Sequence, residues 1–151
     1  MTTGYGSNSA KSEIINLLNP RSTCKNWIDY PIRVYKATGQ FIDNDAWICG
    51  GWLVYDDIRH SGSCFKLGQK SAIPLPNLAN PRGSCSAGVF NNSLFITGGS
   101  DGSTLRTTEY VAENSQKNGV ALPESIYDHC TIQVTANEIL LTGGGAFPFF
   151  K

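Results

Sequence analysis

The feature that most constrains this chain is a glycine pair that follows a short apolar run and recurs at a nearly constant interval. The pairs are Gly50-Gly51, Gly98-Gly99 and Gly143-Gly144, and a shortened version, Thr2-Thr3-Gly4, stands near residue 1. The first glycines of successive corners are separated by 46, 48 and 45 residues. A fixed period of this length is the signature of a repeated supersecondary unit. The chain therefore contains stacked copies of one small structure.

Two other markers keep the same phase, and each has a physical meaning. An asparagine six residues before each glycine pair tolerates positive φ and predicts a tight hairpin. The glycines after each run let the backbone turn sharply and approach its neighbours closely. The second marker is a proline that follows a tyrosine or a leucine and stands shortly before the next unit. The markers are Asn44, Asn92 and Asn137, and Tyr30-Pro31, Leu75-Pro76 and Leu122-Pro123.

The apolar runs and their surroundings predict only strands. Runs 46–49, 94–97 and 139–142 are continuous and short, as expected for strands buried on both faces. Third strands are expected at 13–17, 64–67 and 109–111, and fourth strands at 27–30, 72–75 and 120–122. Sixteen glycines and seven prolines disfavour long helices. An all-β fold with four strands per unit of about 46 residues is the pattern of a β-propeller blade.

These residues resemble kelch repeats over essentially the whole chain. The match consists of the double glycine after an apolar strand, the aromatic third-strand residues Phe65 and Tyr110, the Leu-Pro pair, and Arg82-Gly83. The first corner departs from the pattern, because Tyr5 stands where the second glycine is expected. The alternative is an ordinary β-sandwich with coincidental glycine pairs.

The phase of the repeat gives the expected organisation of the chain. Residues 1–31 form an outer half-blade, 32–78 and 79–124 two full blades, and 125–151 an inner half-blade. The total is an open, three-blade arc, whereas propellers close with about four to eight blades. We therefore expect the remaining blades to come from a longer chain or, as an alternative, from a second copy.

Five cysteines are distributed unevenly over the units. Cys49 precedes a glycine pair and Cys64 opens a third strand of the same blade, so a cross-strand disulfide is one hypothesis and two buried thiols the other. The resemblance to secreted arthropod-type kelch proteins with Cys-Gly-Gly corners favours the bond. Cys85 and Cys130 occupy equivalent innermost positions and suit either a channel lining or a tight inner layer. Cys24 has no evident partner.

Charge and hydropathy exclude two classes of partner. Twelve basic residues balance twelve acidic ones, and no basic run exists, so nucleic-acid binding is not expected. No apolar stretch reaches the length of a membrane span, so no membrane partner is expected either. The compartment, cytoplasmic or secreted, stays open, and no signal peptide is recognisable in this segment.

No pattern indicates catalysis, a cofactor or a metal site. The two histidines, His60 and His129, are far apart, and no Cys-x-x-Cys or Gly-x-Ser-x-Gly occurs. Some kelch-type propellers are oxidases or act on carbohydrates, which leaves an enzyme as one alternative function. An extracellular structural protein is another.

Protein recognition through long loops is the expected function. Strand parity gathers loops 52–62 and 100–106 with the inter-blade segments 77–82 and 124–129 on one face, and loops on a rigid scaffold are where recognition usually resides. Aromatic residues and arginines dominate interface hot spots. Alternatively, the apolar residues of loop 52–62 only pack onto the blade. The candidate partner-binding residues are Trp52, Tyr55, Asp56, Arg59, His60, Arg82, Arg106, Tyr127 and Asp128.

Overall fold

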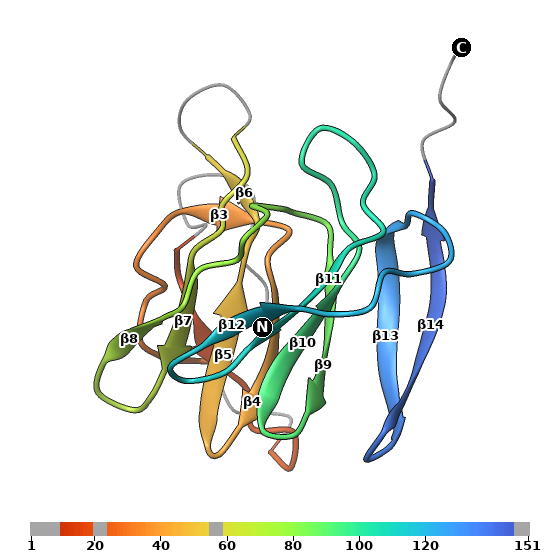
Figure 1. Cartoon of the computed structure of the whole chain (residues 1–151). Helices are drawn as coiled ribbons and strands as arrows, with labels where there is room; N and C mark the ends of the chain where they lie inside the picture. The colour runs from red at the N-terminus through yellow and green to blue at the C-terminus, as the bar shows by residue number, and fades with distance from the viewer. Residues whose placement is uncertain (1–9, 20–23, 55–58, 147–151) are drawn as a thin grey trace.

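The computed structural model describes residues 10–19, 24–54 and 59–146, and every regular element in these ranges is a β-strand (Figure 1). Within them, no helix is present that could cross a membrane. The all-β prediction is confirmed. The strands are β1 (Glu13–Ile14), β2 (Lys25–Asn26), β3 (Val34–Tyr35), β4 (Thr38–Ile42), β5 (Asp45–Cys49), β6 (Trp52–Leu53), β7 (Cys64–Leu67), β8 (Ala72–Leu75), β9 (Ser86–Phe90), β10 (Ser93–Thr97), β11 (Thr108–Val111), β12 (Gln116–Asn118), β13 (Tyr127–Thr135) and β14 (Glu138–Gly145).

Two four-stranded antiparallel sheets form the centre of the described chain. One has the order β4-β5-β7-β8 and the other β9-β10-β11-β12, so each is a meander of sequence neighbours. The pairs β1–β2 and β13–β14 form two-stranded sheets on either side in sequence. A further short pair, β3–β6, ties the segment before β4 to the start of loop 52–62 and was not predicted.

Three predicted strands have different bounds in the structure. Residues 13–17 form a strand only at Glu13–Ile14, and a turn follows. Residues 27–30 follow β2 and are not a strand, although the N–H groups of Trp27 and Tyr30 donate to the carbonyls of Ser12 and Ala10 (both 2.8 Å); the Tyr30 side chain is 1% exposed. Residues 120–122 also lie beyond a strand: β12 ends at Asn118, and the hydroxyl of Thr108 donates to the Val120 carbonyl (2.8 Å).

The asparagine turns are confirmed in the two four-stranded sheets. Asp43 and Asn44 have φ of 48° and 66°, and Asn91 and Asn92 have φ of 47° and 55°. Positive φ at both central residues belongs to the type I′ turn, whose twist matches that of the flanking strands. Asn137 has no such φ, because β13 and β14 change register between Gln133 and Thr135.

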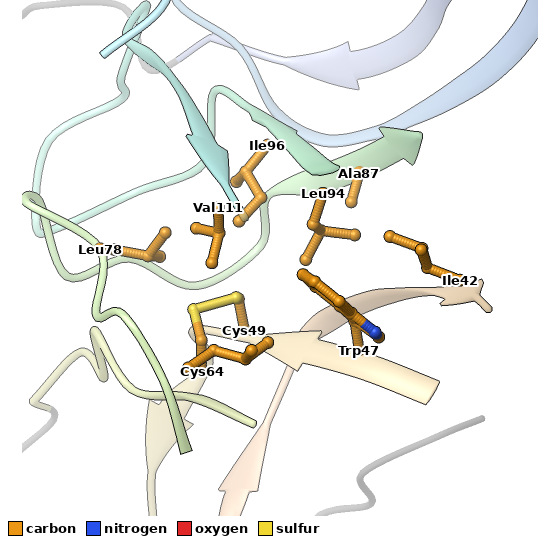
Figure 2. Packing of buried hydrophobic residues seen from close by; sticks show 10 residues of the cluster. Ile42, Trp47, Cys49, Cys64, Leu78, Ala87, Leu94, Ile96 and Val111 are labelled. Atoms are coloured by element: carbon orange, nitrogen blue, oxygen red, sulfur yellow. A yellow bond between two sulfur atoms is a disulfide. The ribbon is translucent and has the colours of Figure 1, made fainter. Parts of the chain in front are cut away.

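Apolar side chains fill the space between successive sheets. Trp47 and Cys49 of β5 face Leu94 and Ile96 of β10, and Val111 of β11 joins the same cluster (Figure 2). The opposite face of β5 carries Ala46 and Ile48, which pack with Tyr30, Val34 and Leu67. The first sheet is therefore covered on both faces.

The third apolar run differs from the expectation of burial on both faces. In β14, Leu140 is 51% exposed, and Ile132 and Val134 of β13 are 48% and 61% exposed. These side chains lie on the last sheet of the described chain, where no further sheet covers them.

The glycine corners hold successive units together. The N–H of Gly51 donates to the carbonyl of Arg82 (2.8 Å), and the N–H of Gly99 donates in the same way to Ile126 (2.8 Å). A Cβ at Gly98 would lie 2.3 Å from the Ile126 oxygen, a distance real Cβ atoms essentially never show. Each corner thus requires glycine because the segment leading into the next unit lies against it.

Candidate partner-binding face

The long loops lie together at one end of the sheets. In Figure 1, β6 and the loop between β10 and β11 lie at the same end of the sheets, and the turns between β4 and β5 and between β9 and β10 lie at the other. His60 in one loop is close enough to Asp101 in the other for the carboxylate to raise the histidine pKa, although burial lowers that pKa more. We call this end the long-loop face.

Trp52 is the anchor of the long-loop face and does not project from it. Its ring stacks on Tyr35 (centroids 6.0 Å apart) and lies 4.2 Å from the ring of His60. A Cβ at Gly83 would fall within 2.0 Å of the indole, so glycine is required there to admit the ring. Leu53 packs against the second core cluster. The start of loop 52–62 is therefore fixed by aromatic and apolar packing.

The other candidate residues differ in exposure. Arg59 and Arg106 are exposed on the long-loop face. Asp128 is exposed at the start of β13 and pairs with Lys36 (3.0 Å), while Tyr127 is half-buried beside Gly145.

Two further candidates, Tyr55 and Asp56, lie outside the described residues.

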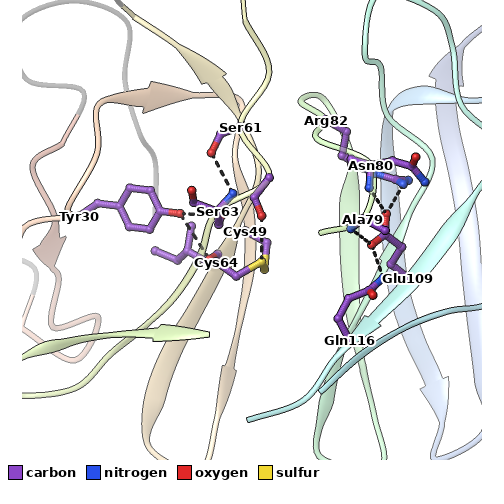
Figure 3. The surroundings of a disulfide bond; sticks show 12 residues. Tyr30, Cys49, Ser61, Ser63, Cys64, Ala79, Asn80, Arg82, Glu109 and Gln116 are labelled. Carbon is purple, nitrogen blue, oxygen red and sulfur yellow. Dashed lines mark hydrogen bonds and ion pairs between the residues drawn. A yellow bond between two sulfur atoms is a disulfide. The ribbon is translucent and has the colours of Figure 1, made fainter. Parts of the chain in front are cut away.

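Arg82 does not belong to any surface, so its assignment as a partner-binding residue is wrong. Its side chain is 0% exposed and donates to Glu109 (2.5 Å), also 0% exposed (Figure 3). The guanidinium also donates to the carbonyls of Asn80, Gly98 and Thr107, each at 3.0 Å. The charge is buried because a carboxylate and three carbonyls replace its water.

Glu109 is the residue of this network that the sequence did not single out. Its carboxylate accepts from the backbone N–H groups of Ala79 (2.7 Å) and Asn80 (3.1 Å) and from the side chain of Gln116 (2.6 Å). The network joins the segment between the two sheets to the second sheet. The only sequence signal was an acidic residue inside an otherwise apolar third strand.

Cys49 and Cys64 lie directly opposite each other on β5 and β7, with their Cα atoms 4.1 Å apart and their sulfur atoms joined. The predicted pairing is present in the structure. At the matching position of the second sheet, Thr97 lies opposite Thr108. The cysteine pair therefore occupies the place of two threonines.

The other three cysteines are in two different environments. Cys85 packs against the first core cluster, and burial raises the pKa of its thiol to about 12. Cys24 and Cys130 are exposed. Cys85 thus acts as a small hydrophobic residue of the inner layer, which is the second of the two interpretations above.

The two histidines do not form a common site. His129 lies at the start of β13, where its Nε2 is 2.8 Å from the Thr97 hydroxyl and burial lowers its pKa. Over the described ranges, no three histidine, cysteine or acidic side chains gather where they could hold a metal ion.

Comparisons with known proteins bear on the fold alone. No protein-family model matches the chain, and no curated protein does. Solved structures do match, among them the structure of YjhT, with a TM-score of 0.62 and 18% sequence identity over 78% of this chain. The chain spans about 36% of the length of that structure. At this identity, the likeness is one of fold.

Proposed function

We propose that this chain is part of a kelch-type β-propeller and that it recognises a protein partner through its long-loop face, without catalysis. Two observations support the architecture. The first strands of three successive sheets, β4, β9 and β13, contact one another in sequence order. The two four-stranded sheets stack face to face through apolar side chains, and the corners at Gly50-Gly51 and Gly98-Gly99 each receive the segment that leads into the next unit. Stacked four-stranded meanders are the pattern of propeller blades.

The observation that carries the recognition function is the contrast between the two ends of the sheets. The long-loop face presents exposed Arg59 and Arg106 together with Asp101 and Asp128, above the fixed base formed by Trp52. The other end consists of tight turns. Charged side chains held on a packed base can meet a partner with little loss of conformational entropy, which favours binding.

Charge reversal at the two ends tests this function. The tagged chain is incubated with extracts of its source, and the retained proteins are compared between the wild type and the double variant Arg59→Glu/Arg106→Glu. The control is Lys70→Glu, because Lys70 lies in the turn after β7 at the opposite end of the sheets. We expect a specific partner to be lost only with the arginine double variant. Equal retention by all three proteins would contradict recognition by the long-loop face.

An exported structural protein is the second candidate, and the pairing of Cys49 with Cys64 favours it. Disulfides persist in oxidising compartments and are rare in the cytosol. Mass spectrometry of the protein alkylated at the moment of lysis of its native source would distinguish the two. An oxidised pair supports export, and two alkylated thiols would contradict it.

A further inference from the structure

The turn between β9 and β10 carries a tripeptide with the pattern of an N-glycosylation acceptor. Asn91-Asn92-Ser93 is an Asn-x-Ser sequence in which x is not proline, and no other Asn-x-Ser or Asn-x-Thr occurs in the 151 residues of the sequence. Such a tripeptide accepts an oligosaccharide only in a chain that enters the secretory pathway, and only where its asparagine reaches the surface. Its position in the fold therefore decides whether it can be used.

Only the middle residue of the tripeptide belongs to the repeat. An asparagine recurs in its place, as Asn44 and Asn137, six residues before each glycine pair. The residues on either side of it differ from unit to unit, so the hairpin does not require the two that make the acceptor. The residues that match Asn91 and Ser93 are Asp43 and Asp45 in the first sheet, and Ala136 and Glu138 in the sheet of β13 and β14.

The structure leaves the side chain of Asn91 in solvent. Asn91 is exposed, and its side-chain amide makes no hydrogen bond to any residue in the described ranges. The neighbouring Asn92 is exposed as well, but its amide donates to the carboxylate of Asp43 in the turn of the first sheet. A sugar on Asn91 would therefore displace no contact, whereas a sugar on Asn92 would break the contact between the two turns.

Ser93 supplies the hydroxyl that the acceptor needs two residues after the asparagine. It lies opposite Phe90 across the turn, and its hydroxyl donates to the carbonyl of Asn91 (3.3 Å). This turn is at the end of the sheets away from the long-loop face (Figure 1). An oligosaccharide at this end leaves Arg59 and Arg106 accessible to a partner.

The disulfide in the core is an independent indication of the compartment. Cys49 and Cys64 are joined across β5 and β7 and are 0% and 1% exposed. Disulfides form and persist in oxidising compartments such as the lumen of the endoplasmic reticulum, through which exported chains pass. The cysteine pair and the acceptor tripeptide lie in different sheets, and both are features of an exported chain.

We propose that Asn91 carries an N-linked oligosaccharide. The proposal rests on export, the second candidate function above, and not on partner recognition. In the transfer, Nδ2 of Asn91 forms a bond to the anomeric carbon of the first sugar, and the bond from that carbon to a phosphate oxygen of a lipid-linked pyrophosphate donor breaks. The pyrophosphate leaves with the bonding electrons, and Nδ2 loses one proton to water.

Peptide mass spectrometry of the protein isolated from its native source tests the site. Peptide N-glycosidase in heavy-oxygen water converts a glycosylated asparagine to labelled aspartate. We expect the label at Asn91 and not at Asn92 or Asn114; Asn114 is the control, because it is exposed and directly precedes a serine without forming an acceptor. An unlabelled Asn91, or equal labelling of Asn91 and Asn114, would overturn the proposal.

Variants of the turn show whether the tripeptide directs the modification. Asn91→Asp removes the amide and keeps a residue type that the first sheet holds at Asp43, where φ is 48° against 47° at Asn91. Ser93→Ala removes the hydroxyl, and Ser93→Thr retains one. In cells of the source, we expect the glycosidase to increase the gel mobility of the wild type and of Ser93→Thr, and to leave Asn91→Asp and Ser93→Ala unchanged. The same response from all four proteins would contradict the assignment.

The state of Cys49 and Cys64 in the same sample separates this proposal from the one on which it rests. An oxidised pair with an unmodified Asn91 overturns the glycosylation site and leaves export supported. Two alkylated thiols with an unmodified Asn91 overturn both. A modified Asn91 supports the site and export together, whatever the state of the cysteines.

Discussion

The buried ion pair between Arg82 and Glu109 provides the sharpest test of how the two sheets are joined. The change we consider is Glu109→Gln, which keeps the size of the side chain and removes its charge. The carboxylate accepts four hydrogen bonds, from Ala79, Asn80, Arg82 and Gln116. A carboxamide has one acceptor oxygen, and its NH₂ group would face donors where the second carboxylate oxygen stood.

The cost follows from the burial of both partners at 0% exposure. Removing one member of a buried pair leaves the other charge uncompensated and costs about 3–5 kcal/mol. The remaining amide oxygen retains part of the hydrogen bonding, so we expect a loss of about 3 kcal/mol in the free energy of unfolding, against a total of about 5–15 kcal/mol for a typical domain. That loss lowers the ratio of folded to unfolded protein by about a hundredfold.

Urea unfolding followed by tryptophan fluorescence measures this loss. The matched control is Glu113→Gln, because Glu113 also pairs with a basic residue, Lys66, but is 62% exposed. Exposed ion pairs contribute little, so this variant should unfold close to the wild type. If both variants unfolded at the same urea concentration, Glu109 would not stabilise the junction in the way described.

Three further predictions concern the corners, the disulfide and pH. Gly98→Ala should lower the free energy of unfolding by about 3–4 kcal/mol, of which about 1–2 kcal/mol is backbone strain and the rest is crowding against the Ile126 carbonyl. Gly102→Ala should cost only the strain, because Gly102 also has positive φ but nothing lies within 4 Å of an added Cβ. Equal losses in urea unfolding would contradict the role of Gly98 in the corner. Reduction of the Cys49–Cys64 disulfide, which joins residues 15 apart, should lower the free energy of unfolding by about 3 kcal/mol. Thiol titration of the unfolded, unreduced protein should count three free thiols among the five cysteines, and a count of five would show that the pair is reduced. Burial lowers the pKa of His129, so the folded protein binds a proton at this residue less readily than the unfolded chain does. The free energy of unfolding is therefore highest above about pH 6.5 and falls as the pH drops below that value. His129→Gln should weaken this pH dependence in thermal unfolding, and an unchanged dependence would exclude His129 as its cause.

The repeat was sufficient to predict the strands that bury their side chains. Runs 46–49 and 94–97 lie in β5 and β10, and the third-strand predictions at 64–67 and 109–111 lie in β7 and β11. Their apolar character and the positive φ demanded at Asn44 and Asn92 are local properties, so the sequence reports them directly.

The features that the sequence did not predict depend on contacts between distant residues. Residues 120–122, expected as a strand, instead bond to distant groups: the Thr108 hydroxyl donates to the Val120 carbonyl, and the Leu122 N–H donates to the Arg106 carbonyl (2.7 Å). Arg82 was placed on the long-loop face because strand parity puts segment 77–82 there, and only a carboxylate 27 residues later makes the burial of its charge favourable. The exposure of the third apolar run, 139–142, depends on whether another sheet packs against it, and a local sequence pattern cannot predict such a contact.

The central claim is that the corners at Gly50-Gly51 and Gly98-Gly99 each receive the segment that leads into the next unit. Hydrogen exchange of the Gly51 and Gly99 amides measures this most directly, because their only described acceptors are the carbonyls of Arg82 and Ile126, each at 2.8 Å. The account predicts that both amides exchange as slowly as the amides of β5 and β10, whereas the Gly102 amide, which donates only to the Ser100 hydroxyl (3.2 Å) within its own exposed loop, exchanges faster. If Gly51 and Gly99 exchanged as fast as Gly102, successive units would not be joined through these corners.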